Sequence, residues 1–115
     1  MKLLTKELRK KLPALYATES IPLKDKIAVA KFFHPASAYT FYVIEGSPVV
    51  DEQDNEVDYT FFGWATHGDP TCAEFGYASL NELQSVRGKL GLGIERDMYF
   101  SPTPLKDISE IKIYD

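Results

Sequence analysis

The chain has 115 residues, of which 44% are hydrophobic and 26% charged, and it carries a formal net charge of −4 at pH 7. Its length predicts one domain over residues 1–115, with enough apolar material to form a core without disulfides or metal ions. The composition excludes an intrachain disulfide, because Cys72 is the one cysteine, and it argues against a membrane-spanning helix and a general affinity for nucleic-acid phosphates.

The first expected element is a short helix over residues 5–12, where leucines recur at helical spacing and Thr5 stands at the N-cap position. Two strands follow, over residues 25–33 and 38–45, because both segments are rich in β-branched and aromatic residues. A short segment that contains a proline separates them, which predicts a β-hairpin. Both faces of these strands are apolar, so we expect each strand to be covered on both sides or to lie centrally in a sheet.

A polar stretch over residues 46–56 comes next, and its Gly, Ser, Pro and acidic residues predict a connecting loop. Residues 57–66 then alternate between polar and apolar side chains and predict a third strand, in which Gly63 indicates a bulge or the close approach of another backbone. A turn over residues 67–72 leads to a fourth predicted strand over residues 73–79.

The segment from Ser79 to Gly88 predicts a short helix with both ends marked. Ser79 and Glu82 stand in the S-x-x-E arrangement of a capping box, in which the serine hydroxyl accepts a bond from the amide of Glu82 and the glutamate reaches back to the amide of Ser79. Gly88 is expected to end the helix in the left-handed conformation.

A fifth strand is predicted over residues 94–100, followed by a short terminal helix or turn with Thr103 as its N-cap and with Leu105 and Ile108 facing inward. The order of the elements is α-β-β-β-β-α-β-α. It predicts the α+β class: a single compact domain with a mostly antiparallel sheet of about five strands and short helices packed on it.

Residue types that bind zinc in other proteins occur in and beside the turn after the third strand: His67, Asp69, Cys72 and Glu74. Their spacing matches no zinc finger, ribbon or zincin pattern. We therefore predict a polar hairpin loop with an ordinary buried cysteine, and we expect neither a metal ion nor another cofactor. His34, which precedes a proline without any nucleophile motif, is interpreted as a hydrogen-bonded turn residue rather than a general base.

A second group of polar residues lies on or beside the predicted strands: Glu45, Glu74, Glu95, Arg96 and Asp97. In one interpretation they converge in a pocket, where paired carboxylates share a proton or a cation and the arginine holds a phosphate. In the other, Arg96 forms an internal ion pair with a carboxylate of a neighbouring strand, such as Glu45 or Glu74. The second interpretation is favoured, because structural ion-pair networks are common.

Charge is distributed unevenly along the chain. Residues 45–69 contain seven acidic residues and no Lys or Arg. Five of these acids form a candidate interaction surface: Asp51, Glu52, Asp54, Glu56 and Asp58. Such a surface could imitate the phosphates of a nucleic acid and occupy a basic groove on an enzyme. The alternative, which is commoner for such runs, is a solvated loop whose charge maintains solubility.

The first helix carries the opposite charge, on Lys6, Arg9, Lys10 and Lys11. A basic helix beside an aromatic sheet allows single-stranded nucleic-acid binding, although no RNP-type motif supports it. A solvated helix face is the commoner explanation.

The runs KFFHP, YVIEG, FFGW, EFGYASLNEL and IERDMYFSPTPL form a pattern spread over nearly the whole chain. This pattern resembles the small bacterial and phage proteins of the domain of unknown function 2958 family. The resemblance implies an accessory gene of plasmids, phages and other mobile elements, with a role in conjugation or in countering host defence. It implies no catalytic residue.

The first functional hypothesis is therefore a non-enzymatic, cytoplasmic interaction protein of a mobile element. Its expected partner is a host protein, such as a nuclease or effector that binds nucleic acid, and an anti-restriction or anti-CRISPR inhibitor is the sharpest form of the hypothesis. One alternative is a small ligand-binding or hydrolytic domain that uses the carboxylate and arginine pocket. The other is single-stranded nucleic-acid binding, which the charge balance disfavours. We expect no contact with a membrane.

Overall fold

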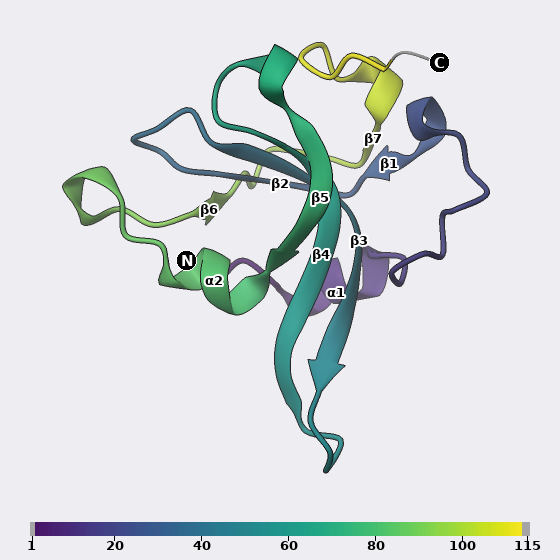
Figure 1. The fold of residues 1–115 in the computed structure, drawn as a ribbon, viewed down its shortest axis with the longest axis vertical. Helices are drawn as coiled ribbons and strands as arrows, with labels where there is room; N and C mark the ends of the chain where they lie inside the picture. The colour runs from purple at the N-terminus through teal and green to yellow at the C-terminus, as the bar shows by residue number, and fades with distance from the viewer. Residues whose placement is uncertain (1, 114–115) are drawn as a thin grey trace.

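The computed structural model describes residues 2–113, and within them the strands form a five-stranded antiparallel sheet, in the order β5-β4-β3-β2-β6, and a two-stranded sheet of β1 and β7 (Figure 1). The strands are β1 (Ile27–Ala28), β2 (Ala30–Phe33), β3 (Thr40–Val50), β4 (Glu56–Thr66), β5 (Glu74–Ser79), β6 (Glu95–Arg96) and β7 (Thr103–Pro104). The helices are α1 (Lys6–Lys11) and α2 (Leu80–Ser85), with short 3₁₀ turns at η1 (Leu23–Asp25), η2 (Pro70–Cys72), η3 (Lys89–Gly91) and η4 (Leu105–Asp107). The predicted α+β class is confirmed.

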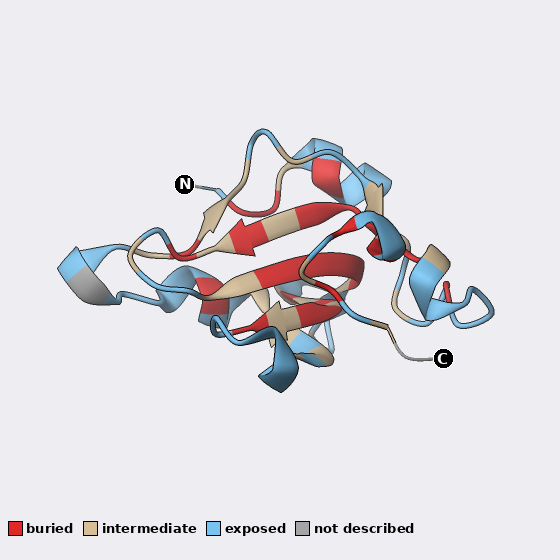
Figure 2. Ribbon diagram, turned by 90° about the horizontal axis from the view of Figure 1, so that it is seen from above, coloured by how far each residue is buried: buried red, intermediate tan, exposed pale blue. Residues whose placement is uncertain are grey.

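Successive side chains of the large sheet point to opposite faces, and each face carries its own core. The first face packs against α1, and its core includes Leu8, Phe32, Phe41, Val43 and Phe61. The second face packs against the C-terminal segment, and its core includes Tyr42, Ile44, Trp64, Leu105 and Ile108. Figure 2 shows the buried residues concentrated on the central strands. The prediction that these strands are covered on both sides is confirmed.

Both helices begin where the sequence predicts. The hydroxyl of Thr5 accepts a hydrogen bond from the Leu8 amide at 3.1 Å, and that of Ser79 accepts one from the Glu82 amide at 3.3 Å. The predicted end of α2 is wrong: the helix ends at Ser85, and the left-handed conformation occurs later, at Leu90 with φ 62° and at Gly91 with φ 70°. Within residues 2–113, no helix has the length and apolar character that crossing a bilayer requires.

The predicted loop over residues 46–56 is wrong over most of its length, because β3 continues to Val50 and β4 begins at Glu56. Pro48 lies within this continuation. Since β2 pairs with β3 no further than Val43, β4 is the one strand paired with β3 here among the described residues, and a proline without an N–H is tolerated on the side without a paired strand. The polar residues therefore extend a hairpin, and only a short turn at its tip remains.

The predicted strand over residues 25–33 is divided between the two sheets, because β1 pairs with β7 and β2 pairs with β3. Thr103 belongs to β7 and is therefore not a helix N-cap. The predicted strand over residues 94–100 is reduced to β6, because a turn at Asp97 follows it. Leu105 and Ile108 face inward as predicted, with 0% and 8% of their surface exposed.

Candidate functional site

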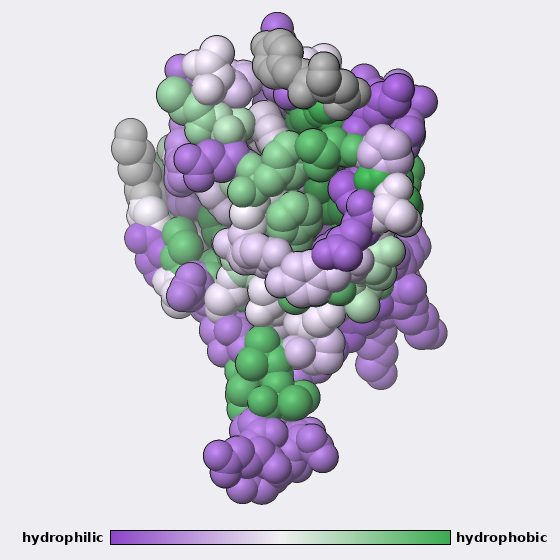
Figure 3. Space-filling model, turned by 45° about the vertical axis from the view of Figure 1, so that its right-hand side comes forward, coloured by the Kyte–Doolittle hydropathy of each residue, from purple (hydrophilic) through white to green (hydrophobic). Residues whose placement is uncertain are grey.

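The continuation of β3 and β4 forms a two-stranded projection, residues 46–59, which we call the hairpin arm (Figure 1). β2 and β5 pair with β3 and β4 only outside this range, so the arm has no third strand among the described residues. Its stem exposes three valines: Val49 at 39%, Val50 at 52% and Val57 at 51%. Figure 3 shows this apolar band and the hydrophilic tip beyond it.

The tip of the arm is shaped by Asp51. One of its carboxylate oxygens accepts hydrogen bonds from the amides of Gln53 and Asn55, both at 2.9 Å. The bond from Asn55, together with that from Gln53, holds the pKa of Asp51 below its ordinary value. Asp54 adopts the left-handed conformation with φ 62°, which aspartate tolerates in tight turns. Glu52 and Asp54 are exposed.

Glu56, at the start of β4, binds α1. The Arg9 guanidinium donates to both of its carboxylate oxygens, with 2.8 Å between Nη1 and Oε1. The same guanidinium lies over the Tyr59 ring, 5.1 Å from its centroid. The bond from Arg9 holds the pKa of Glu56 below its ordinary value. Because each side chain is more than a third exposed, the pair orients the arm against α1 more than it stabilises the fold.

Asp58 joins the base of the arm to the start of α2. Its Oδ2 accepts a hydrogen bond from the Ser79 hydroxyl at 2.6 Å, and its Oδ1 accepts one from the Asn81 amide at 3.0 Å. The hydrogen bond from Ser79, together with those from the backbone amides of Asn81 and Tyr59, holds the pKa of Asp58 below its ordinary value. Three of the five acids of the predicted interaction surface thus have partners within the chain, while Glu52 and Asp54 present their charge to solvent.

Replacing Ser79 with alanine is expected to lower the free energy of unfolding by about 1–2 kcal/mol, because the change removes both the cap of α2 and a donor to Asp58. Urea denaturation would measure the loss. Ser85→Ala, at the exposed end of the same helix, is the matched control and should cost less than about 0.5 kcal/mol. Equal losses in the two variants would contradict the role of Ser79.

Glu45, from the predicted carboxylate and arginine pocket, is buried on β3 with 4% exposure. Its carboxylate accepts bonds from the amides of Tyr16 and Thr18, at 2.9 and 3.0 Å, and from the Thr18 hydroxyl. The Lys26 ammonium donates to the same hydroxyl at 3.0 Å. Burial alone raises the pKa of Glu45, but these hydrogen bonds and Lys26 outweigh it and hold the pKa below its ordinary value. Glu45 thus fixes the segment between α1 and β1.

The other members of that predicted pocket lie elsewhere. Arg96 and Asp97 line a cavity of about 80 Å³ beside α1, and Glu95 lines another of about 330 Å³. Glu45 lines a third cavity, of about 110 Å³, and Glu74 is exposed on β5. The described residues therefore do not bring these five side chains into one shared cavity.

The turn after β4 holds the candidate zinc ligands. Asp69 caps η2 by accepting a bond from the Thr71 amide at 3.0 Å, and the ring of His67 packs on that of Tyr39. Cys72 is exposed, so the expectation of a buried cysteine is wrong. In the described part of the chain, no group of three or more His, Cys, Asp or Glu side chains is placed to hold a metal ion.

His34 is a hydrogen-bonded turn residue, as its position before proline predicts. Its Nδ1 accepts a bond from the Ala36 amide at 3.1 Å, which leaves Nε2 to donate to the Leu92 carbonyl at 2.8 Å. Gly88 allows this arrangement, because a Cβ there would lie 2.6 Å from Nε2. Both ring nitrogens are occupied, so His34 positions the chain after α2.

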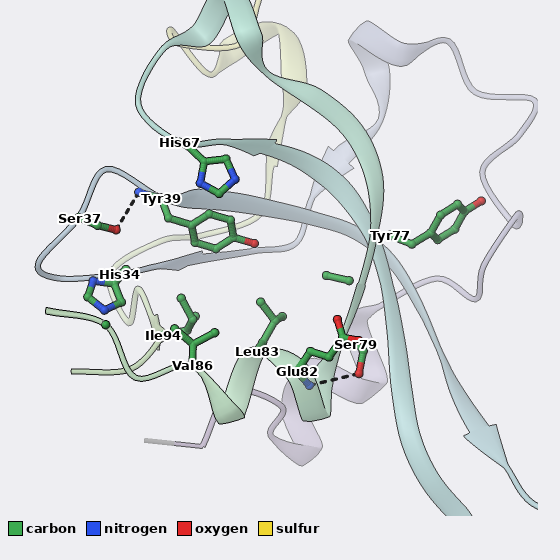
Figure 4. A pocket seen from close by; sticks show the side chains of 12 residues that line it. His34, Ser37, Tyr39, His67, Tyr77, Ser79, Glu82, Leu83, Val86 and Ile94 are labelled. Carbon is green, nitrogen blue, oxygen red and sulfur yellow. Dashed lines mark hydrogen bonds between the residues drawn. The ribbon is translucent and has the colours of Figure 1, made fainter. Parts of the chain in front are cut away.

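A cavity of about 520 Å³ lies between β5, α2 and the turn that joins β2 to β3 (Figure 4). Its lining comes from segments far apart in the sequence and includes His34, Tyr39, His67, Ala78, Leu83 and Ile94. Sequence analysis does not find it, because no motif connects these residues.

A family model described as "Protein of unknown function (DUF2958)" matches residues 3–111 of the chain. No curated protein and no solved structure matches it. The match spans every element from α1 to η4. The chain therefore belongs to the DUF2958 family of proteins of unknown function.

Proposed function

We propose that this protein is a non-enzymatic binding module that inserts its hairpin arm into a groove of a partner protein. The observation that carries the proposal is the exposure of Val49, Val50 and Val57 on a two-stranded projection. These side chains add little to the core of the free protein, whereas covering them with a partner removes apolar surface from water.

The charge of the arm supports a partner with a basic groove. Glu52 and Asp54 are exposed at the tip, and residues 45–69 contain no Lys or Arg to balance them. A complementary groove has apolar walls and basic residues where the tip enters. Basic grooves occur on proteins that bind nucleic acid. The proposed partner is such a host protein, a nuclease or effector, and the protein would then act for a mobile element as an anti-restriction or anti-CRISPR inhibitor.

The arrangement of the acids limits how far the arm resembles a phosphate backbone. Asp51 shapes the turn, Glu56 binds Arg9 and Asp58 binds Ser79, so these carboxylates are already engaged. Binding should then depend on the valines as well as on the two exposed acids. Its affinity should fall less steeply with salt than the affinity of the same partner for nucleic acid.

Replacing Val50 and Val57 together with serine is expected to weaken partner binding by at least about tenfold, because two apolar anchors would be lost. The tagged full chain would isolate the partner from host lysate, and calorimetry on the purified pair would give the affinity. The matched control replaces Ile21 and Leu23 with serine, since they are exposed at 40% and 38% but lie outside the arm.

Charge reversal at the tip measures what the two exposed acids contribute to binding, separately from the valines. Glu52→Lys with Asp54→Lys is expected to slow association and reduce its salt dependence, whereas Glu74→Lys, also exposed but on β5, should leave both unchanged. If the purified partner binds the valine and charge variants as tightly as the original chain, the arm is not the binding surface and the proposal is wrong.

Neither alternative function gains support from the geometry. Arg96 shares a cavity with Asp97, but Glu95 and Glu45 line two other cavities, which does not favour a common reaction site. On the basic helix, Arg9 is engaged by Glu56, so fewer cations face solvent for binding nucleic acid.

A further inference from the structure

The cavity of about 520 Å³ beside α2 has the shape of a slot between two unlike walls. The rings of Tyr39 and His67, with centroids 5.2 Å apart, form the first wall. The side chains of Leu83, Val86 and Ile94 form the second (Figure 4). Aromatic and aliphatic surfaces facing each other suit a flat ring, and the volume is that of a pocket for one small molecule.

The main chain of β5 forms a third wall. Tyr77, Ala78 and Ser79 all line the cavity, although successive side chains of a strand point to opposite faces. The Tyr77 ring points away from the cavity and contacts Phe62, so Tyr77 contributes its backbone (Figure 4). Among the described residues β5 pairs with β4 alone, and an edge strand leaves alternate N–H and C=O groups without a neighbouring strand. These groups can bond polar atoms at the edge of a ring.

The hydroxyl of Tyr39 points into the cavity (Figure 4), and no described residue forms a hydrogen bond with it. Burial raises the pKa of Tyr39 to about 12, so the hydroxyl stays protonated at neutral pH and can both donate and accept. The slot therefore offers a fixed polar group beside its apolar walls.

The charge of the lining disfavours one class of ligand, the anions. Glu82 contributes a carboxylate, and none of the described lining residues is a lysine or an arginine. A phosphate or carboxylate would enter without a cation to balance it and would be repelled by Glu82.

We propose that this cavity binds a flat heteroaromatic molecule without negative charge, held between Tyr39 and the side chains of Leu83, Val86 and Ile94. The polar edge of its ring bonds the Tyr39 hydroxyl and the main chain of β5. This site is separate from the hairpin arm and does not depend on the function proposed for it.

Titration of the isotope-labelled full chain with quinoline, adenine, benzoate and cyclohexanol, followed by amide NMR, tests the proposal. Quinoline and adenine are flat and uncharged near neutral pH, benzoate is a flat anion, and cyclohexanol is apolar but not flat. We expect saturable shifts for quinoline and adenine at the amides of residues 77–79 and 83–86, with dissociation constants below about 1 mM. Benzoate and cyclohexanol should bind at least about tenfold more weakly.

Two variants connect binding to the slot. Tyr39→Phe keeps the ring but removes the hydroxyl, and it is expected to weaken adenine binding by about tenfold. Tyr99→Phe, at a tyrosine that is 98% exposed, should change nothing. Val86→Phe places a ring in the slot and should abolish binding while the rest of the amide spectrum is preserved. Absence of saturable binding, equal binding of benzoate, or shifts located away from β5 and α2 would overturn the proposal.

Discussion

Replacing Gly63 with alanine is expected to lower the free energy of unfolding by about 3 kcal/mol or more, because the added methyl group would overlap the neighbouring strand. Gly63 lies in the middle of β4, between β3 and β5. A Cβ at this position would lie 1.9 Å from the Tyr42 carbonyl oxygen and 2.8 Å from a ring carbon of Phe41. Because the nearest atom belongs to the backbone of β3, the strands would have to separate to admit it. Urea denaturation at neutral pH would measure the loss.

The register partner of Gly63 provides the control. Gly76 lies opposite it on β5, and a Cβ there would meet no atom within 4 Å. Gly76→Ala should therefore leave stability unchanged or raise it by up to about 1 kcal/mol, because alanine restricts the unfolded chain more than glycine does. Comparable losses in the two variants would show that the contact with Tyr42 is not the reason for glycine at position 63.

Replacing Glu45 with glutamine is expected to lower the free energy of unfolding by about 2–3 kcal/mol at neutral pH. The carboxylate accepts three bonds from Tyr16 and Thr18, and a glutamine offers one oxygen and a donor in its place. The buried ammonium of Lys26 would also lose its nearby negative charge. Glu74→Gln, at an exposed carboxylate on β5, is the matched control and should change stability by less than about 0.5 kcal/mol.

The pH dependence provides a second measurement on Glu45. Its folded pKa lies below the ordinary value of 4.5, so its ionised form stabilises the fold above pH 4.5. This contribution is lost as the pH falls from 4.5 through the folded pKa. The difference in stability between the original chain and Glu45→Gln should therefore narrow below pH 4.5. A difference that stays constant down to acid unfolding would show that the charge of Glu45 is unimportant.

Local interactions made part of the fold predictable. The caps at Thr5 and Ser79 depend on a bond between residues three positions apart, which a sequence shows directly. The apolar alternation of β3 likewise depends on neighbouring positions alone, and it predicts the two covered faces of the sheet. The α+β class follows from the order of such elements.

The hairpin arm could not be predicted from local interactions. The polar residues around Pro48 are typical of loops, yet they form strand because each side of the hairpin has the other as its partner. Pairing also explains β7, whose two residues form strand only because β1 lies beside them. Strand formation depends on a neighbour that is distant in sequence, and local composition does not contain that neighbour.

The roles of the polar residues, like strand pairing, depend on neighbours that are distant in the sequence. The sequence by itself determined that the protein is a small α+β member of its family. It did so through its length, its helix caps, its alternating strand faces and the distributed pattern of residues. The tertiary structure alone decided that Glu56 binds Arg9, 47 positions away, that Glu45 anchors the segment around Thr18, and that Tyr39 and His67 face α2 across a cavity. The physical reason is that a charge or a ring acquires its role from what lies within a few ångströms of it, and those neighbours are set by chain folding rather than by sequence spacing.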